Sequence, residues 1–251
     1  MEHRRVDLDD VIYGVHAVTE AMAAGEPLRK LHIGEERKRD AAVRQIIARA
    51  LERSVPVRFE NRRFFSRFPY KAHQSVIGFA APFEYAALSD VLQRRPAGSS
   101  ALIVVLDHIT DPHNAGAIIR TAECAGASGL ILPERRAAGV NPTVRKTAAG
   151  AVGHLPIARV VNLADALRKL KKAGVWIAGA DAGPGSVPLL EADFRSDVAI
   201  VIGAEGKGLS DVVRRECDFT VRIPLMGRVA SLNASVAAGV ILYEALRQRS
   251  C

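Results

Sequence analysis

Residues 101–127 read ALIVVLDHITDPHNAGAIIRTAECAGA, an apolar run followed by a turn and then a helical pattern. An apolar run without polar alternation is typical of a parallel strand buried on both faces. Asp111-Pro112 predicts the turn, and Asn114 is expected to cap the helix that follows. Arg120 is an isolated arginine among small apolar residues in this helix, and a buried guanidinium without a partner is costly. We therefore expect Arg120 to face a cleft, an acidic side chain or a ligand phosphate; the alternative is a buried structural ion pair.

The same strand-then-helix pattern continues to the C-terminus. Apolar runs predict strands at 101–107, 129–133, 175–181, 198–203 and 219–225. Helical patterns separate these strands at 114–126, 162–172, 209–215 and 231–249. Alternation of this kind predicts an α/β fold in which a mostly parallel sheet carries helices on both faces.

The N-terminal part of the chain predicts a smaller α/β unit. Its expected strands lie at 11–14, 28–34, 55–60 and 75–81, and its expected helices at 14–25 and 39–54. The second helix is amphipathic, with an expected buried face of Val43, Ile46, Ile47, Ala50 and Leu51. The segment that follows the unit contains Pro96, Gly98 and two serines, which is typical of a linker. We therefore expect a substrate-binding domain at 1–84, a linker at 85–100 and a second domain at 101–251.

The charge of the chain favours a polyanionic partner. The 251 residues carry a formal net charge of +8, and residues 28–73 alone hold thirteen Lys or Arg against five Asp or Glu. Within them, RFENRRFFSRFPYK at 58–71 interleaves basic and aromatic side chains. Arginines neutralise phosphates and exposed aromatics stack on unpaired bases, so this patch predicts RNA contact. For any single aromatic in it, a place in the core is the favoured interpretation.

Other classes of protein are disfavoured by what the sequence omits. The cysteines are odd in number and show no metal-ligand spacing, so we expect no metal, no disulfide framework and a reducing cytoplasm. The first ten residues, MEHRRVDLDD, lack the apolar region of a secretory signal. No apolar run approaches the roughly 20 residues that span a bilayer, so we expect no membrane partner.

Two later segments also place glycine or polar residues at expected strand ends. Residues 201–210 read VIGAEGKGLS, in which Glu205 lies between glycines. The segment has neither the dinucleotide fingerprint nor a phosphate-loop motif, which also argues against a nicotinamide dehydrogenase. Residues 223–235 read IPLMGRVASLNAS, in which Ser231 and Asn233 open the last helix. In open α/β sheets, ligands bind at such strand ends.

Taken together, the three segments resemble the three motifs of the SpoU, or TrmH-like, branch of the SPOUT RNA methyltransferases. They match in order, spacing and residue type, with Leu225 and Ala234 as small departures that remove no polar group. The stretches VIYGVHAVTEAM at 11–22 and HQSVIGFAAPFEY at 73–85 resemble the small RNA-binding domain, akin to a ribosomal protein, that many of these enzymes carry. The resemblance therefore covers nearly the whole chain.

This resemblance implies a fold, a cofactor and a substrate. It implies a C-terminal domain with a deep trefoil knot, which binds the methyl donor S-adenosylmethionine through backbone groups at Gly203, Ile223 and Leu232. It implies a homodimer with the active site at the subunit interface. The expected reaction is 2′-O-methylation of a guanosine in 23S ribosomal RNA. Two alternatives stay open: methylation of transfer RNA or another ribosomal site, and a catalytically silent RNA-binding assembly factor.

The resemblance also implies five catalytic residues. Arg120 is expected to stabilise negative charge on the ribose oxygen or to let a phosphate take the proton, because an arginine stays protonated and is a poor base. Asn114 would orient Arg120 or the hydroxyl, and Glu205 would pair with Arg120. Ser231 and Asn233 would complete the polar pocket.

His113 is an alternative proton acceptor, although a single histidine in a turn is more often structural or in contact with phosphate.

Overall fold

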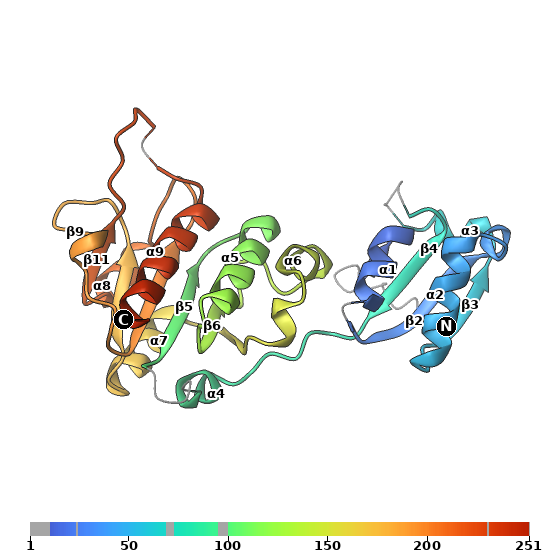
Figure 1. Cartoon of the computed structure of the whole chain (residues 1–251), viewed down its shortest axis with the longest axis horizontal. Coiled ribbons are helices and arrows are strands. Elements are labelled where there is room, and N and C mark those ends of the chain that lie inside the picture. The colour runs from blue at the N-terminus through green and yellow to red at the C-terminus, as the bar shows by residue number, and fades with distance from the viewer. Residues whose placement is uncertain (1–10, 24, 69–72, 95–99, 230, 251) are drawn as a thin grey trace. The chain divides into compact units, whose positions relative to one another are not determined.

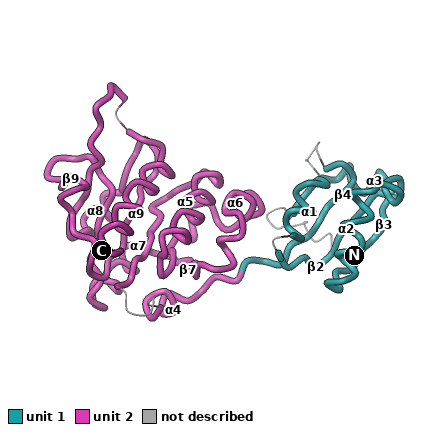
Figure 2. The backbone as a smooth tube through the Cα atoms, viewed as in Figure 1, with its two compact units in different colours: residues 1–83 teal, residues 84–251 magenta. Residues whose placement is uncertain are grey.

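The computed structural model describes residues 11–23, 25–68, 73–94, 100–229 and 231–250. The chain folds into two compact units, residues 1–83 and 84–251, shown in Figure 2. Several sequence predictions fall outside the described residues: those on residues 1–10, on Tyr70 and Lys71 of the basic patch, on Pro96 and Gly98 of the linker, and on Cys251. Each unit is a separate α/β structure with its own core.

The first unit is a four-stranded sheet in the order β1-β4-β2-β3. Strand β4 is antiparallel to both β1 and β2, whereas β2 and β3 are parallel. One apolar cluster contains residues of α1, α2, β2 and β4, and a second contains Phe65 and Phe68. The elements are β1 (Val11–Tyr13), α1 (Val15–Ala23), β2 (Leu28–Gly34), the 3-10 turn η2 (Glu35–Arg37), α2 (Ala41–Glu52), β3 (Val57–Glu60), α3 (Arg62–Phe65) and β4 (Val76–Ala80).

Helix α2 follows the amphipathic pattern with one exception. Asp40 caps it, and Val43, Ile46 and Ala50 are buried as expected. Leu51 was expected on the same face but is 71% exposed. Leu51 lies about 100° around the helix from Ala50, which turns its side chain away from the sheet.

The aromatics of the basic patch belong mainly to the core. Phe65 and Phe68 are buried, and Phe64 packs against both of them. Phe59 is the exception, with 39% of its surface exposed and the Nζ of Lys38 lying 4.3 Å from its ring centre. The favoured interpretation, that a given aromatic is a core residue, is thus confirmed for Phe65 and Phe68.

The second unit is built on a seven-stranded sheet in the order β7-β6-β5-β10-β8-β11-β9, in which every pair is parallel (Figure 1). The five expected strands are present, and all six residues of β5 are buried, as predicted for a strand covered on both faces. Its strands are β5 (Leu102–Asp107), β6 (Gly129–Pro133), β7 (Ile157–Val160), β8 (Trp176–Ala180), β9 (Val187–Pro188), β10 (Val198–Gly203) and β11 (Phe219–Arg222). Strands β7 and β9 were not expected, because both are short edge strands without an apolar run.

Helices cover both faces of this sheet. Val91 of α4, Leu167 of α7 and Val213 of α8 share one apolar cluster with β5, β6, β8 and β10. Helices α5 and α9 pack against each other, and α6 packs against α5. Helix α4 lies within the expected linker at 85–100 and contributes to the core of the unit. The helices are α4 (Leu88–Gln93), α5 (Pro112–Cys124), α6 (Pro142–Ala148), α7 (Leu163–Lys172), α8 (Asp211–Glu216) and α9 (Ala234–Arg249), with 3-10 turns η3 (Ala151–Gly153) and η4 (Leu189–Glu191).

The starts of α5 and α9 differ from those expected in a way that bears on the site. Asp111, not Asn114, caps α5, and its side chain accepts a hydrogen bond from the backbone N of His113. With Pro112 already in the first turn, Asn114 falls inside the helix and is buried. Helix α9 begins at Ala234, after its cap Asn233, rather than at residue 231. The trefoil knot stays a prediction.

Helices α5 and α6 approach so closely that the contact requires Gly116. A Cβ there would lie 2.6 Å from the Cβ of Thr147 and 2.8 Å from the carbonyl oxygen of Val144. Gly116→Ala is therefore expected to lower the free energy of unfolding by about 1–3 kcal/mol, measured by urea denaturation. The matched control is Gly239→Ala in α9, where the nearest atom would be 3.8 Å away and the change is expected to be neutral or stabilising. Equal effects of the two substitutions would contradict this account.

Candidate active site

The three sequence motifs follow strands that end at one edge of the sheet. Strands β5 and β10 are parallel neighbours, paired so that Gly203 lies opposite Asp107. The segment after β5 leads into α5, the segment after β10 forms a glycine-rich loop, and the segment after β11 leads into α9. The carboxyl edge of the sheet therefore gathers the polar residues of all three motifs.

The loop after β10 closes on itself. Ala204 and Gly208 exchange two backbone hydrogen bonds of 3.0 and 2.8 Å. Gly206 and Gly208 adopt φ of 75° and 65°, a region that favours glycine. A Cβ on Gly203 would lie 2.3 Å from the carbonyl carbon of Gly208, so the returning chain excludes a side chain there. The glycines thus fix the position of Glu205 at the tip of the loop.

Asn114, Glu205 and Asn233 form one polar group, although each comes from a different motif. The Nδ2 of Asn233 donates to Glu205 Oε1 at 2.8 Å and to Asn114 Oδ1 at 2.9 Å. The Nδ2 of Asn114 lies 3.4 Å from Glu205 Oε2, a long hydrogen bond. The Oδ1 of Asn233 caps α9 by accepting from the backbone N of Ser235 and Val236. Asn233 therefore joins the start of α9 to both other motifs.

Arg120 does not join this group. It is exposed on α5, and among the described residues it has no hydrogen bond or ion pair. The expected pairing of Glu205 with Arg120 is wrong within one chain, because the Glu205 carboxylate accepts from the two asparagine amides instead. The physical reason is helix phase: six residues after Asn114, Arg120 lies about 9 Å along the axis and roughly 120° around it.

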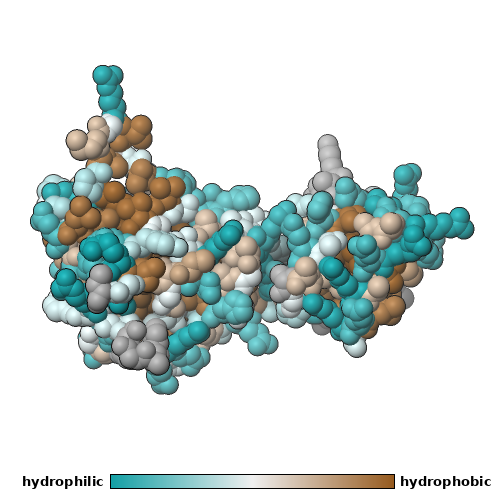
Figure 3. Space-filling model, in the orientation of Figure 1, coloured by the Kyte–Doolittle hydropathy of each residue, from teal (hydrophilic) through white to brown (hydrophobic). Residues whose placement is uncertain are grey.

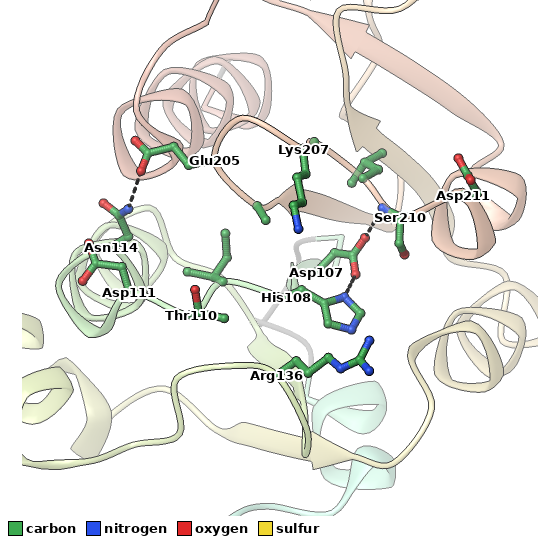
Figure 4. A pocket seen from close by; sticks show the side chains of 14 residues that line it. Asp107, His108, Thr110, Asp111, Asn114, Arg136, Glu205, Lys207, Ser210 and Asp211 are labelled. Carbon is green, nitrogen blue, oxygen red and sulfur yellow. Dashed lines mark hydrogen bonds and ion pairs between the residues drawn. The ribbon is translucent and has the colours of Figure 1, made fainter.

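Two cavities meet at the loop after β10. We call the first the apolar cavity; its volume is about 350 Å³, and Gly203, Ile223 and Leu232 all line it, as does Ser231. We call the second the polar cavity; its volume is about 760 Å³, and Asn114 lines it (Figure 4). Four residues line both cavities: Ala204, Glu205, Lys207 and Gly208. The loop is thus the wall between the two, and Glu205 reaches both sides.

Comparison with known proteins identifies this arrangement. The SpoU rRNA Methylase family matches residues 101–243, and the domain described as RNA 2'-O ribose methyltransferase substrate binding matches residues 11–86. The chain belongs to the SpoU family of RNA methyltransferases. The predicted α/β fold, with an N-terminal substrate-binding domain and a C-terminal SpoU domain, is confirmed.

Individual relatives agree with this assignment. The chain is 43% identical over 242 residues to the 23S rRNA (guanosine-2'-O-)-methyltransferase RlmB of Pseudomonas syringae pv. tomato, covering 95% of this chain and 96% of that protein. It is also 43% identical to an uncharacterized tRNA/rRNA methyltransferase of Synechocystis, covering 96% of this chain but only 63% of that longer protein. The crystal structure of the SpoU methyltransferase AviRb of Streptomyces viridochromogenes, in complex with AdoMet, superposes with a TM-score of 0.69 at 31% identity and covers 96% of this chain and 90% of that one.

The apolar cavity of this SpoU chain fits an adenosyl ligand. Its walls combine the backbone of the glycine loop with small and branched apolar side chains, and the Glu205 carboxylate lies at its border with the polar cavity. Pockets of this size that are mainly apolar, with a few polar groups, are typical of small-molecule sites. Apart from alanines, the apolar side chains that line it are Ile202, Val221, Ile223, Leu225, Leu232 and Ile241.

Several polar residues of the SpoU site were not predicted from the sequence. Asp107, His108, Arg136 and Lys207 all line the polar cavity. Two of them could have been found from the sequence. Asp107 is a carboxylate at the end of an apolar run, and Lys207 lies inside the second motif. No sequence signal singled out His108 or Arg136.

Metal and thiol chemistry find no support in the described residues. They contain no cluster of three or more His, Cys, Asp or Glu side chains that could hold a metal ion. Burial raises the pKa of the Cys217 thiol to about 12, so it stays protonated near neutral pH.

None of the helices in the described part of the chain is both long enough and apolar enough to cross a membrane.

Proposed function

We propose that this chain transfers a methyl group from S-adenosylmethionine to the ribose 2′-hydroxyl of a guanosine in 23S ribosomal RNA, in the cytoplasm. The observation that carries the proposal is the shared wall between the two cavities. A donor in the apolar cavity and a nucleotide in the polar cavity would meet at Glu205, where the three motifs converge. Holding both reactants in one geometry is the main contribution that such a site makes.

The roles of the residues follow from their positions. S-adenosylmethionine supplies an electrophilic methyl on its sulfonium when it is bound. Gly203, Ile223 and Leu232 would hold it through backbone groups, with Ser231 on the same wall. The amides of Asn233 and Asn114 fix the two oxygens of the Glu205 carboxylate at the border of the cavities.

The part of the site that would hold the RNA ribose depends on the side-chain amides of Asn114 and Asn233 and on Arg120. Asn114 is held by Asn233 and lines the polar cavity, where it would orient the ribose hydroxyl. Arg120 would stabilise the charge that develops on the ribose oxygen as the hydroxyl proton passes to an RNA phosphate. Because Arg120 lies outside both cavities of its own chain, this role requires a second chain.

A homodimer would supply that chain. Val236, Val240 and Tyr243 form an exposed apolar stripe on α9, at the spacing of one helix face. Helix α9 packs against α5, which carries Arg120, and Figure 3 shows apolar surface over this part of the second unit. An apolar stripe of this kind is typical of a protein interface. We propose that it pairs two copies and brings Arg120 of one copy to the polar cavity of the other.

RNA, rather than a small nucleotide, is the proposed acceptor class. The first unit matches the substrate-binding domain of RNA 2'-O ribose methyltransferases, and its basic side chains are mostly exposed around an aromatic core. Exposed lysines and arginines neutralise backbone phosphates without reading sequence. The name of the RlmB relative favours 23S ribosomal RNA as the specific substrate.

The substrate is testable by mapping 2′-O-methyl groups in cells with and without this gene. We expect one guanosine of 23S ribosomal RNA to lose its methyl group in the deletion strain and to regain it when the parent gene is restored. Purified protein should transfer labelled methyl groups from S-adenosylmethionine to the 23S RNA of the deletion strain but not to that of the parent. Loss of a transfer RNA methyl group instead would make the alternative substrate correct. An absence of donor binding would favour the silent assembly factor.

A further inference from the structure

One part of the polar cavity is built by residues outside the three-motif polar group. Asp107, at the end of β5, is almost fully buried, and its Oδ1 lies 2.5 Å from the Nδ1 of His108. Its Oδ2 accepts a hydrogen bond of 2.6 Å from the backbone N of Ser210. The His108 side chain is 39% exposed and lines the cavity. The buried carboxylate therefore holds the imidazole in one orientation, with its other nitrogen free to meet a ligand.

Two cations share this part of the cavity. Arg136 and Lys207 both line it, and with the residues that the structure describes neither forms a hydrogen bond or an ion pair. In the view of Figure 4, the Nζ of Lys207 and the guanidinium of Arg136 point toward His108 from opposite sides. Unneutralised positive groups that converge on a polar hollow are suited to an anion.

Four acidic residues line the cavity: Asp107, which is buried and bonded to His108 and the Ser210 backbone, and three that are engaged elsewhere. Asp111 caps α5, Glu205 is held by two asparagine amides, and Asp211 lies in the first turn of α8, where a negative charge is favourable. Figure 4 places these three carboxylates toward the ends of the view, with Arg136 and Lys207 between them. In the middle of the cavity, Arg136 and Lys207 therefore face one carboxylate, Asp107, whose oxygens are already bonded to His108 and the Ser210 backbone.

The backbone supports a functional role for this cluster. His108 and Arg136 adopt φ of 59° and 56°, in the left-handed region that side chains other than glycine rarely occupy. Such conformations cost on the order of 1 kcal/mol each and cluster at ligand-binding sites. Glycine would adopt this backbone conformation without strain, but it has no side chain to place in the cavity. His108 and Arg136 both place their side chains in it.

We propose that His108, Arg136 and Lys207 bind one backbone phosphate of the RNA and so position the nucleotide whose ribose lies against Glu205. The inference rests on the proposed function and adds residues that bind the acceptor. Arginine presents several N–H donors in a fork that matches a phosphate, and lysine adds a point charge. All three should affect RNA binding, and His108 and Arg136, which line only the polar cavity, should leave the donor site unchanged.

The test compares Arg136→Gln and Lys207→Gln with the parent, using the full chain and 23S RNA from the deletion strain. Losing a charged hydrogen bond to phosphate is expected to raise the KM for RNA by about 10-fold in each variant, with kcat within about 3-fold of the parent. The slope of log KM against log salt should fall by about 0.7–0.9 for each lost phosphate contact. The Kd for S-adenosylmethionine should not change in Arg136→Gln, because Arg136 lines only the polar cavity, and the midpoint of urea unfolding should not change in either variant.

Arg135→Gln is the matched control. It removes the same charge one residue away, from an exposed side chain that lines neither cavity, so its KM and salt slope should stay at the parent values. His108→Asn, which tolerates the left-handed backbone, should raise the KM as Arg136→Gln does. Unchanged KM in Arg136→Gln and Lys207→Gln, or equal shifts in Arg135→Gln and Arg136→Gln, would overturn the phosphate assignment. If the parent itself methylates no RNA, the proposed function fails instead.

Discussion

Asn233→Ala is expected to lower kcat for RNA methylation by about 100-fold or more, because removing one preorganised donor from a catalytic site typically costs two to three powers of ten. The Asn233 amide is the closest donor to Glu205, at 2.8 Å, and it also holds Asn114. Without it, neither side chain keeps its direction at the border of the two cavities. The measurement is kcat at saturating RNA and S-adenosylmethionine, so that a change in affinity does not contribute.

Asn233 also caps α9, and this structural role must be separated from the catalytic one. Asn233→Asp keeps the oxygen that accepts from Ser235 and Val236, but it replaces the amide donor by a carboxylate facing Glu205. We expect Asn233→Asp to preserve the helix cap and still lose activity to the same extent. A kcat near the parent value for Asn233→Asp would contradict the proposed role.

Asn162→Ala supplies the control for cap loss alone. Asn162 caps α7 through the backbone N of Asp165, and it lines neither cavity. Both alanine variants are expected to lose about 1 kcal/mol in the free energy of unfolding. Asn162→Ala should keep the parent kcat, so that only the loss specific to Asn233 reports on the chemistry.

The sheet of the second unit was predictable because its strands carry a strong local signal. The run 101–107 is apolar throughout, and all of β5 is buried in the structure. Strand β7 had no such signal, because it is a short edge strand that carries the exposed Arg159, whose guanidinium lies over the ring of Tyr85. Local pattern thus identifies central strands and misses those whose place in the sheet depends on partners distant in sequence.

The site was predictable only in part, for a similar reason. The convergence of Asn114, Glu205 and Asn233 followed from three motifs at strand ends. The cap of α5 did not, since Asp111 and Asn114 are both good capping residues and Pro112 decides between them. His108 and Arg136 meet only in the folded chain, through backbone conformations that no local pattern indicates. A motif also names a residue such as Arg120 without saying whether it would act in its own chain or in a second copy.

Arg120→Ala is expected to lower kcat by about 100- to 1,000-fold, the range for losing a charged group that stabilises a developing oxyanion. The Kd for S-adenosylmethionine should not change, because Arg120 does not line the apolar cavity. Arg120→Lys is expected to recover little, since lysine lacks the planar fork of donors. Equilibrium dialysis with labelled donor and single-turnover methylation measure the two quantities separately. A parent-like kcat in Arg120→Ala would contradict a catalytic role and leave Arg120 as a surface residue.

Mixing two inactive variants tests whether Arg120 acts across the interface. If Arg120 of one protomer completes the polar cavity of its partner, each site combines Asn233 of one chain with Arg120 of the other. A dimer of one Arg120→Ala chain and one Asn233→Ala chain then contains one site with both defects and one intact site. Random reassociation of equal amounts should then restore about a quarter of the parent activity. If both residues act within one chain, every site in the mixture carries a defect and no activity returns. Tyr243→Asp, which places a charge on the apolar stripe of α9, should prevent the recovery by keeping the chains apart, which analytical ultracentrifugation would detect as a shift to monomer.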